Sequence, residues 1–150
     1  MGRIDICVEV SMMSSQVAMP REGHLQQLYQ IFGYLKAHHN ARIMMDPSYP
    51  EIKDSEFPKH KWDKFYNVSG ELKPSNAPEP LGMELVIRAY VDADHAGDQL
   101  TRRSRTGFIV FVNSALIYWL SKKQAGVESS TFRSEFLAMK HCCKYLRGLR

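Results

Sequence analysis

Apolar and polar residues alternate along residues 85–92, which is the pattern of a β-strand with one buried face. Asp92 is predicted to close this strand. Two further apolar runs follow at residues 108–112 and 115–120, separated by the short turn Asn113-Ser114. Three strands joined by short connections predict an antiparallel meander.

Two segments have the three-to-four spacing of apolar residues that is typical of amphipathic helices. The first spans residues 22–36 after Pro20, and we expect about four turns, an apolar face in the core and Asn40 as C-terminal cap. The second follows the N-cap candidates Ser129-Ser130-Thr131. Its apolar stripe is predicted to lie on the sheet and consists of Phe132, Phe136, Met139, Cys143 and Leu146.

Residues 4–14 allow two interpretations. Alternating apolar residues favour a strand, whereas helical spacing fits only loosely. Residues 46–83 hold six of the seven prolines and are predicted to be a linker. Within it, Trp62, Phe65 and Tyr66 are expected to dock on a neighbouring domain.

The 150 residues suffice for one medium domain, or for one small domain and part of another. No apolar run is long enough to span a membrane, and no signal peptide is recognisable. The three cysteines form no visible disulfide framework, so an intracellular protein is expected.

Charge is distributed unevenly along the chain. Residues 1–98 hold ten Lys and Arg against fourteen Asp and Glu, whereas residues 99–150 hold ten against two, a net charge of +8. A basic segment beside an acidic loop suits a polyanion that is bound by cations while a metal ion acts on one phosphate. A solvated basic face is the alternative that charge alone leaves open.

The acidic loop is where chemistry is expected, because Asp92, Asp94 and Asp98 lie within seven residues after the first strand. Carboxylates at a strand end can hold a divalent cation. The alternative is that Asp94 and Asp98 cap turns. The spacing disfavours an EF-hand, because its fifth position would be Ala96 and its twelfth would be Arg103 instead of Glu.

Glu135 is the other acidic candidate, in the first turns of the last predicted helix. A Glu near a helix N-terminus is commonly a favourable partner of the helix dipole. A helix packed across a three-stranded meander can also bring its first turns beside the end of the first strand, where Asp92 lies.

Four blocks of the sequence resemble the ribonuclease H domain of copia-type retrotransposon polyproteins. These are Tyr90 to Asp98, Arg102-Arg103-Ser104-Arg105-Thr106-Gly107, Trp119-Leu120-Ser121-Lys122-Lys123-Gln124 and Ser129 to Phe136. Upstream, Arg3-Ile4-Asp5-Ile6 and Pro20 to Lys36 resemble the end of the reverse transcriptase. The resemblance therefore implies helices near the N-terminus, which outweighs the alternation over residues 4–14.

The resemblance implies an α/β fold, of the α+β type with a mixed sheet, that is ribonuclease H-like and truncated after its first helix. It divides the chain into residues 1–45, a helical end of the reverse transcriptase; 46–83, the Pro-rich linker; and 84–150, a partial ribonuclease H-like domain. The family's fourth and fifth strands and remaining helices are then missing.

Carried over by motif, Asp92 and Glu135 are the catalytic and metal-binding carboxylates of a Mg²⁺-dependent hydrolase that cleaves RNA in RNA-DNA hybrids. Two Mg²⁺ ions, with Mn²⁺ as a possible substitute, would lie about 4 Å apart. The candidates for phosphate contacts are Arg102, Arg103, Arg105, Lys122 and Lys123. His95 stands where the family often has an aromatic residue, and we interpret it as a local packing variant.

No Asp or Glu follows Glu135, so the catalytic set is incomplete and weak or absent activity is expected. The alternatives are a non-catalytic nucleic-acid-binding or assembly fragment and a degenerate fragment with no activity. Expected partners are an RNA-DNA hybrid and the rest of the polyprotein, without a membrane. The expected location is a virus-like particle in the cytoplasm, or the nucleus.

Overall fold

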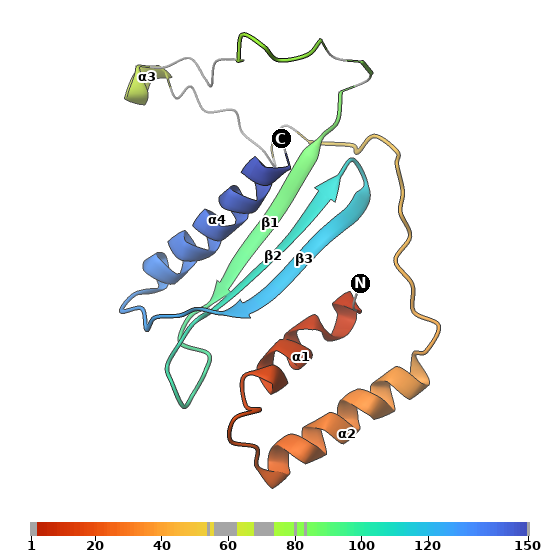
Figure 1. The fold of residues 1–150 in the computed structure, drawn as a ribbon, viewed down its shortest axis with the longest axis vertical. Helices are drawn as coiled ribbons and strands as arrows, with labels where there is room; N and C mark the ends of the chain where they lie inside the picture. The colour runs from red at the N-terminus through yellow and green to blue at the C-terminus, as the bar shows by residue number, and fades with distance from the viewer. Residues whose placement is uncertain are drawn as a thin grey trace.

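The computed structural model describes residues 3–53, 55, 63–67, 74–79, 81–82 and 84–149. The fold is of the α+β type, as predicted, with helices around a three-stranded antiparallel sheet (Figure 1). Its elements in chain order are a 3-10 helix Ile4–Ile6, α1 Cys7–Ser14, α2 Glu22–Ala37, α3 Asp63–Tyr66, β1 Ile87–Asp94, β2 Arg105–Val112, β3 Ala115–Lys123 and α4 Thr131–Gly148.

The sheet is the predicted meander, with β2 between β1 and β3. Its strands run further than expected, however. Asp92 does not close β1, because Ala93 and Asp94 continue the ladder opposite Thr106 and Arg105. The apolar pattern ends before the strand does, since the backbone ladder needs no apolar side chains. The polar residues that follow it therefore lie on the sheet.

The core lies between α4 and one face of the sheet. Phe108 and Val110 from β2 are buried against Cys142 of α4. The rings of Tyr118 on β3 and Tyr145 on α4 stack with centroids 4.0 Å apart. α4 packs mainly on β1 and β2 and runs along β1 in Figure 1.

The predicted sheet-facing stripe of α4 is wrong except at Leu146, which is partly buried against the core. Phe132 is 79% exposed, Phe136 and Met139 are about half exposed, and Cys143 is exposed as well. The helix instead buries its small residues, which are Ser134, Ala138 and Cys142. Small side chains let the helix backbone approach the sheet closely, so large apolar residues are not required on the packed face.

Residues 4–14 are helical, as the resemblance implied and against their alternation. α1 packs on β3, and the hydroxyls of Ser14 and Ser15 donate to carbonyls four residues earlier, which uses their polar groups within the helical segment. The strand interpretation is therefore wrong.

α2 forms where predicted, but its apolar face is not core. None of its residues is buried, and Leu25 and Phe32 are mostly exposed. The helix also ends before Asn40, because the C-cap is His38, whose N–H donates to the Tyr34 carbonyl over 2.8 Å. Few contacts join α2 to α1, which explains the exposed face.

A polar cluster joins the 3-10 helix Ile4–Ile6, which leads into α1, to α2. Asp5 accepts hydrogen bonds from the Arg3 guanidinium and, over 3.0 Å, from the Tyr34 hydroxyl. Arg3 also donates to the His38 carbonyl over 2.8 Å. These donors lower the pKa of Asp5 to about 2, and the Arg3 guanidinium contributes most. Arg3 and Tyr34 belong to the two segments that resembled the reverse-transcriptase end.

The start of the linker is attached to the β2–β3 turn. Ser114 donates its N–H to the Ser48 carbonyl over 3.1 Å, and the Asn113 side chain donates to the Pro47 carbonyl over 3.3 Å. Phe65 is 80% exposed, so its predicted docking is wrong. Trp62 and the Tyr66 side chain lie outside the described residues.

None of the helices in the described part of the chain is both long enough and apolar enough to cross a membrane.

The assignment of the packed face of α4 can be tested with two neighbouring substitutions. Ala138→Asp should lower the free energy of unfolding by about 3 kcal/mol or more, because it places a carboxylate against the buried core. Met139→Asp, on the exposed side of the same turn, should lower it by less than about 1 kcal/mol. Urea unfolding followed by circular dichroism gives both values, and equal losses would contradict the assignment.

Candidate metal and nucleic-acid site

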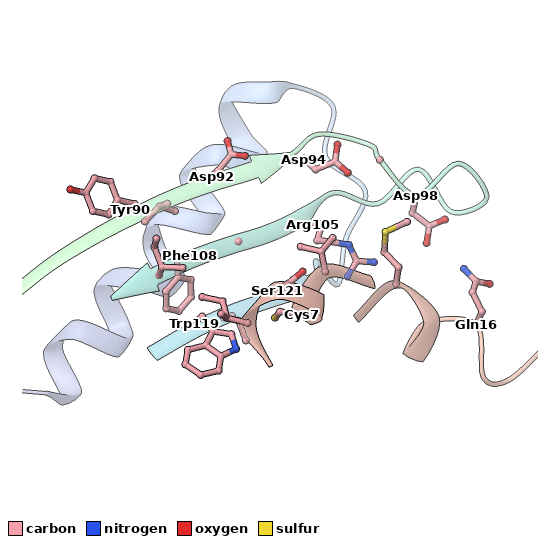
Figure 2. Close-up of a pocket in the computed structure, with 18 of the residues that line it drawn as sticks. Cys7, Gln16, Tyr90, Asp92, Asp94, Asp98, Arg105, Phe108, Trp119 and Ser121 are labelled. Carbon is pink, nitrogen blue, oxygen red and sulfur yellow. The ribbon is translucent and has the colours of Figure 1, made fainter. Parts of the chain in front are cut away.

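The two predicted catalytic carboxylates come from elements that pack on each other. Asp92 lies on β1 opposite Gly107 of β2 and is exposed. Its neighbours Val91 and Ala93 face the core, so Asp92 projects from the other side of the strand. Figure 2 shows its carboxylate at the outer edge of the sheet, pointing away from Trp119. Glu135 is half-buried and follows the buried Ser134 on α4.

These carboxylates do not by themselves make a complete metal site. Among the described residues, no three His, Cys, Asp or Glu side chains gather closely enough to hold a metal ion. Carboxylate oxygens are the ligands that Mg²⁺ prefers, but a pair of such ions needs more negative charge than Asp92 and Glu135 supply. The donor type therefore fits Mg²⁺, and the donor number does not.

Asp98 has a structural role in the β1–β2 loop. Its Oδ1 accepts from the backbone N–H groups of Leu100 and Thr101 over 3.1 and 2.9 Å, and its Oδ2 accepts from the Lys123 ammonium over 3.0 Å. The backbone donor Thr101 and the Lys123 ammonium together lower the pKa of Asp98 to about 2. Of the two alternatives for Asp98, turn capping is the one that its contacts match.

Asp94 is packed against the backbone of the same loop. A Cβ atom added at Gly97 would overlap the Asp94 carboxylate, so a larger residue at this position would require the exposed Asp94 side chain to move. Across the ladder, Asp94 lies opposite Arg105. The contacts of the loop thus fix the Asp98 carboxylate, whereas Asp92 and Asp94 are both exposed on β1.

A buried polar cluster connects this loop to the first turns of α4. The His95 Nδ1 lies 3.2 Å from the Ser134 hydroxyl, and Ser104 Oγ accepts the Ala96 N–H over 3.1 Å. The Gln124 side-chain amide donates to the Ser134 carbonyl over 3.0 Å and to the Thr106 hydroxyl over 3.1 Å.

This cluster is what positions Glu135, because it fixes the preceding residue, Ser134, against β1 and β2. Ser104, Thr106, Gln124 and Ser134 are all buried, and their hydrogen bonds compensate for the loss of water except at Gln124 Oε1, which has no partner among the described residues. Sequence reasoning named these positions within motifs but gave them no role. The signal was the presence of Gln124 and Ser134 where an apolar core residue would otherwise be expected. The packing role interpreted for His95 agrees with its contacts.

The five predicted phosphate-binding cations are not equally accessible. Arg102 and Lys122 are exposed, and Arg103 is partly buried. Arg105 donates to the Ser11 hydroxyl of α1. Lys123 forms the ion pair with Asp98. Two of the five therefore present their charge to solvent, whereas Arg105 and Lys123 hold the fold together.

A groove of about 750 Å³ lies between α1 and the sheet face opposite α4 (Figure 2). Its sheet side includes Tyr90, Ile109 and Trp119, and its helix side includes Cys7 and Met12. Sequence reasoning missed this groove, since it depends on α1 covering β3 while leaving β1 and β2 open. No local pattern specifies how far a helix extends over a sheet.

Comparison with known proteins finds, among other relatives, retrovirus-related Pol polyproteins of plant transposons. The chain is 32% identical over 134 residues to the retrovirus-related Pol polyprotein from transposon RE1 of Arabidopsis thaliana, which covers 89% of this chain and 7% of that protein. The corresponding polyprotein from transposon TNT 1-94 of Nicotiana tabacum is 39% identical over 57 residues, 38% of this chain and 4% of that protein. For transposon RE2 of Arabidopsis thaliana the identity is 38% over 68 residues, 45% of this chain and 5% of that protein.

The chain thus spans a small part of the length of these relatives. No protein-family model matches it, and no solved structure is significantly similar to it.

The structural role of Asp98 gives a pH-dependent prediction. At pH 7, Asp98→Asn should lower the free energy of unfolding by about 1–2 kcal/mol, because the side chain loses charge-assisted hydrogen bonds. Since the folded-state pKa is below the unfolded value of about 3.9, this stability is present above pH 4 and is lost as the pH falls toward 2. The wild type and the variant should therefore converge in acid.

Denaturant unfolding at a series of pH values measures this difference. Lys123→Met should reproduce part of the loss at pH 7, whereas Lys122→Met, at the exposed neighbouring position, should not. A difference between wild type and Asp98→Asn that stays constant down to pH 2 would contradict the assigned role.

Proposed function

On the premise that this chain is related to the Pol polyproteins of copia-type plant retrotransposons, we propose that residues 84–149 belong to a ribonuclease H-like region whose substrate is the RNA of RNA-DNA hybrids. Within the 150 residues of this chain, the proposed region binds the hybrid and hydrolyses its RNA strand weakly or not at all. The observation that carries the proposal is that Asp92 is exposed on β1 while a buried polar cluster fixes the turn of α4 that bears Glu135.

In the proposed site, Asp92 and Glu135 each supply carboxylate oxygens to Mg²⁺ or Mn²⁺, which stabilises charge on a scissile phosphate when bound. The buried Gln124 and Ser134 act as positioning residues for Glu135. Because the donor set is incomplete, metal binding by this chain is weak. No hydrolytic step is assigned to the chain alone.

Hybrid binding in this proposal depends on phosphate contacts. Arg102 and Lys122 are exposed at the end of the sheet that carries the β1–β2 loop, and they project their charge into solvent. Contacts to the backbone position a hybrid without reading its sequence, and recognition of the RNA strand would depend on its 2′-hydroxyls and A-like shape.

A second candidate function is a non-catalytic nucleic-acid-binding or assembly fragment. The observation that favours it is the lack of a cluster of three metal-ligating side chains within the residues that the structure describes. The two functions share the cation contacts and differ in whether Asp92 is needed. They are therefore separable by experiment.

The hydrolytic part is tested with an end-labelled RNA-DNA hybrid, the 150-residue chain and Mg²⁺ or Mn²⁺. We expect at most a trace of RNA product, which Asp92→Asn and Glu135→Gln both abolish while hybrid binding is retained. Trace cleavage that survives both substitutions would reject the site. Rapid cleavage by the wild type would reject the incomplete donor set, and a complete lack of cleavage with intact binding would favour the second function.

The binding part predicts unequal effects of neighbouring lysines. Removing one phosphate contact by Arg102→Ala or Lys122→Ala should reduce the slope of log K against log salt by about 1. Lys123→Ala should change the slope less, because its ammonium is paired with Asp98. Fluorescence anisotropy with a labelled hybrid at several salt concentrations measures each slope. A larger change for Lys123→Ala than for Lys122→Ala would contradict the assignment of contacts.

A further inference from the structure

The end of β1 and the first turns of α4 are joined by a hydrogen bond between two side chains. β1 ends and α4 begins at the same end of the sheet (Figure 1). Ala93 is buried in the core, and alternation along the chain turns His95 to the same side, toward α4. The His95 Nδ1 lies 3.2 Å from the Ser134 Oγ. This contact links the chain just beyond Asp92 to the residue that precedes Glu135.

The direction of this hydrogen bond follows from the other contact of the Ser134 hydroxyl. The Ser134 Oγ lies 2.7 Å from the Thr131 carbonyl oxygen. A carbonyl oxygen can only accept, so the single hydroxyl hydrogen of Ser134 lies between these two oxygens. Toward His95, the hydroxyl oxygen is therefore left to act as an acceptor. The hydrogen in the bond between His95 and Ser134 then belongs to the His95 Nδ1.

The other contacts of the imidazole are compatible with this assignment. Ser104 Oγ lies 3.5 Å from the His95 Nδ1, too far for a strong hydrogen bond, and it accepts the Ala96 N–H over 3.1 Å. His95 is half-buried, and its Nε2 has no hydrogen-bond partner among the residues that the structure describes. In the neutral imidazole, the hydrogen is therefore on Nδ1 and the lone pair is on Nε2.

The backbone turn after His95 holds the imidazole in this place. Ala96 has a φ of 53°, in the left-handed region that residues with a Cβ atom rarely adopt. Ser104 accepts its N–H, and the loop beyond it closes where the Arg102 N–H donates to the Asp98 carbonyl over 2.7 Å. Such a conformation persists only where the surrounding contacts fix it. The loop is therefore a defined base from which the His95 side chain reaches α4.

We propose that His95 is a positioning residue of the candidate metal site. As the Nδ1–H tautomer it donates to Ser134, and this bond sets where Glu135, the next residue of α4, lies relative to Asp92. The inference rests on the proposed role of Asp92 and Glu135 as metal ligands. It goes beyond packing, because an apolar side chain of similar size could fill the same space, whereas a hydrogen bond of fixed direction needs the Nδ1–H donor.

The tautomer is tested by NMR on the ¹⁵N-labelled 150-residue chain, without a metal ion. Two-bond ¹⁵N–¹H correlation spectra distinguish a ring nitrogen that carries hydrogen from one that carries a lone pair. At about pH 8.5, above the range in which histidine side chains ordinarily titrate, the His95 Nδ1 should carry the hydrogen, and Ser134→Ala should lower that fraction. The chain has six histidines, so His95→Asn identifies the His95 signals by their loss. A wild type with the hydrogen on Nε2 would overturn the proposal.

The need for a donor is tested by amide hydrogen exchange in two matched variants. His95→Leu keeps an apolar side chain but no donor, whereas the amide nitrogen of His95→Asn can take about the place of Nδ1. The leucine variant should exchange the amides of residues 134–138 roughly tenfold faster than the wild type, because the buried Ser134 hydroxyl loses its donor and the first turns of α4 open more readily. The asparagine variant should exchange them at most about threefold faster, and the amides of β2 should be unchanged in both variants. Equal rates for leucine and asparagine would overturn the proposal.

The positioning role is tested with Mn²⁺ and the same two variants. Paramagnetic broadening at the amides next to Glu135 should weaken several-fold in His95→Leu and be restored in His95→Asn, while the amides next to Asp92 change less. If the wild type shows this broadening and His95→Leu keeps it in full, the positioning role is wrong although the proposed metal site stands. If the wild type shows no broadening near either carboxylate, the proposed metal site is wrong, and with it the positioning role, whatever the tautomer.

Discussion

The close approach of α4 to β1 and β2 is the constraint on which the rest of the structure depends. Ala138 and Cys142 are small enough to bring the helix backbone near the sheet, and Phe108 and Val110 fill the space between them. At the N-terminal end of α4, a hydrogen bond from the Gln124 side chain to the Ser134 carbonyl, and not apolar packing, holds the helix to the sheet. The position of Glu135 relative to β1 is therefore set by the core and not by Glu135 itself.

That packing determines which charged residues stabilise the fold and which stay exposed. Residues at the ends of β2 and β3 face the β1–β2 loop or α1, and there Lys123 pairs with Asp98 and Arg105 with Ser11. Asp92 has no such structural partner within the described residues and stays exposed on an edge strand.

Sequence patterns were sufficient to predict the elements that depend only on residues close together in the chain. The meander followed from alternation and short turns, and α2 followed from helical spacing. The packed face of α4 could not be predicted this way. The spacing of apolar residues predicts that Phe132 and Phe136 face the sheet, whereas the close approach of the helix to the sheet requires a small residue such as Ala138 there. The sequence alone allows both metal binding and turn capping for Asp98. Its partner Lys123 is 25 residues away, and only the register of the strands brings the two side chains together. The helical state of residues 4–14 came from a family motif, against their alternation.

The central proposal is that Asp92 and Glu135 hold one metal ion weakly around the outer edge of β1, since Asp92 projects from the side of the strand that faces away from the core. Paramagnetic broadening of backbone amide signals by Mn²⁺, measured on the labelled 150-residue chain by NMR, tests it without reference to activity. The account predicts broadening centred on the amides near Asp92 and Glu135 together, and its loss in both places on Asp92→Asn. Broadening centred on Asp98, or broadening at Asp92 that leaves the first turns of α4 unaffected, would contradict it.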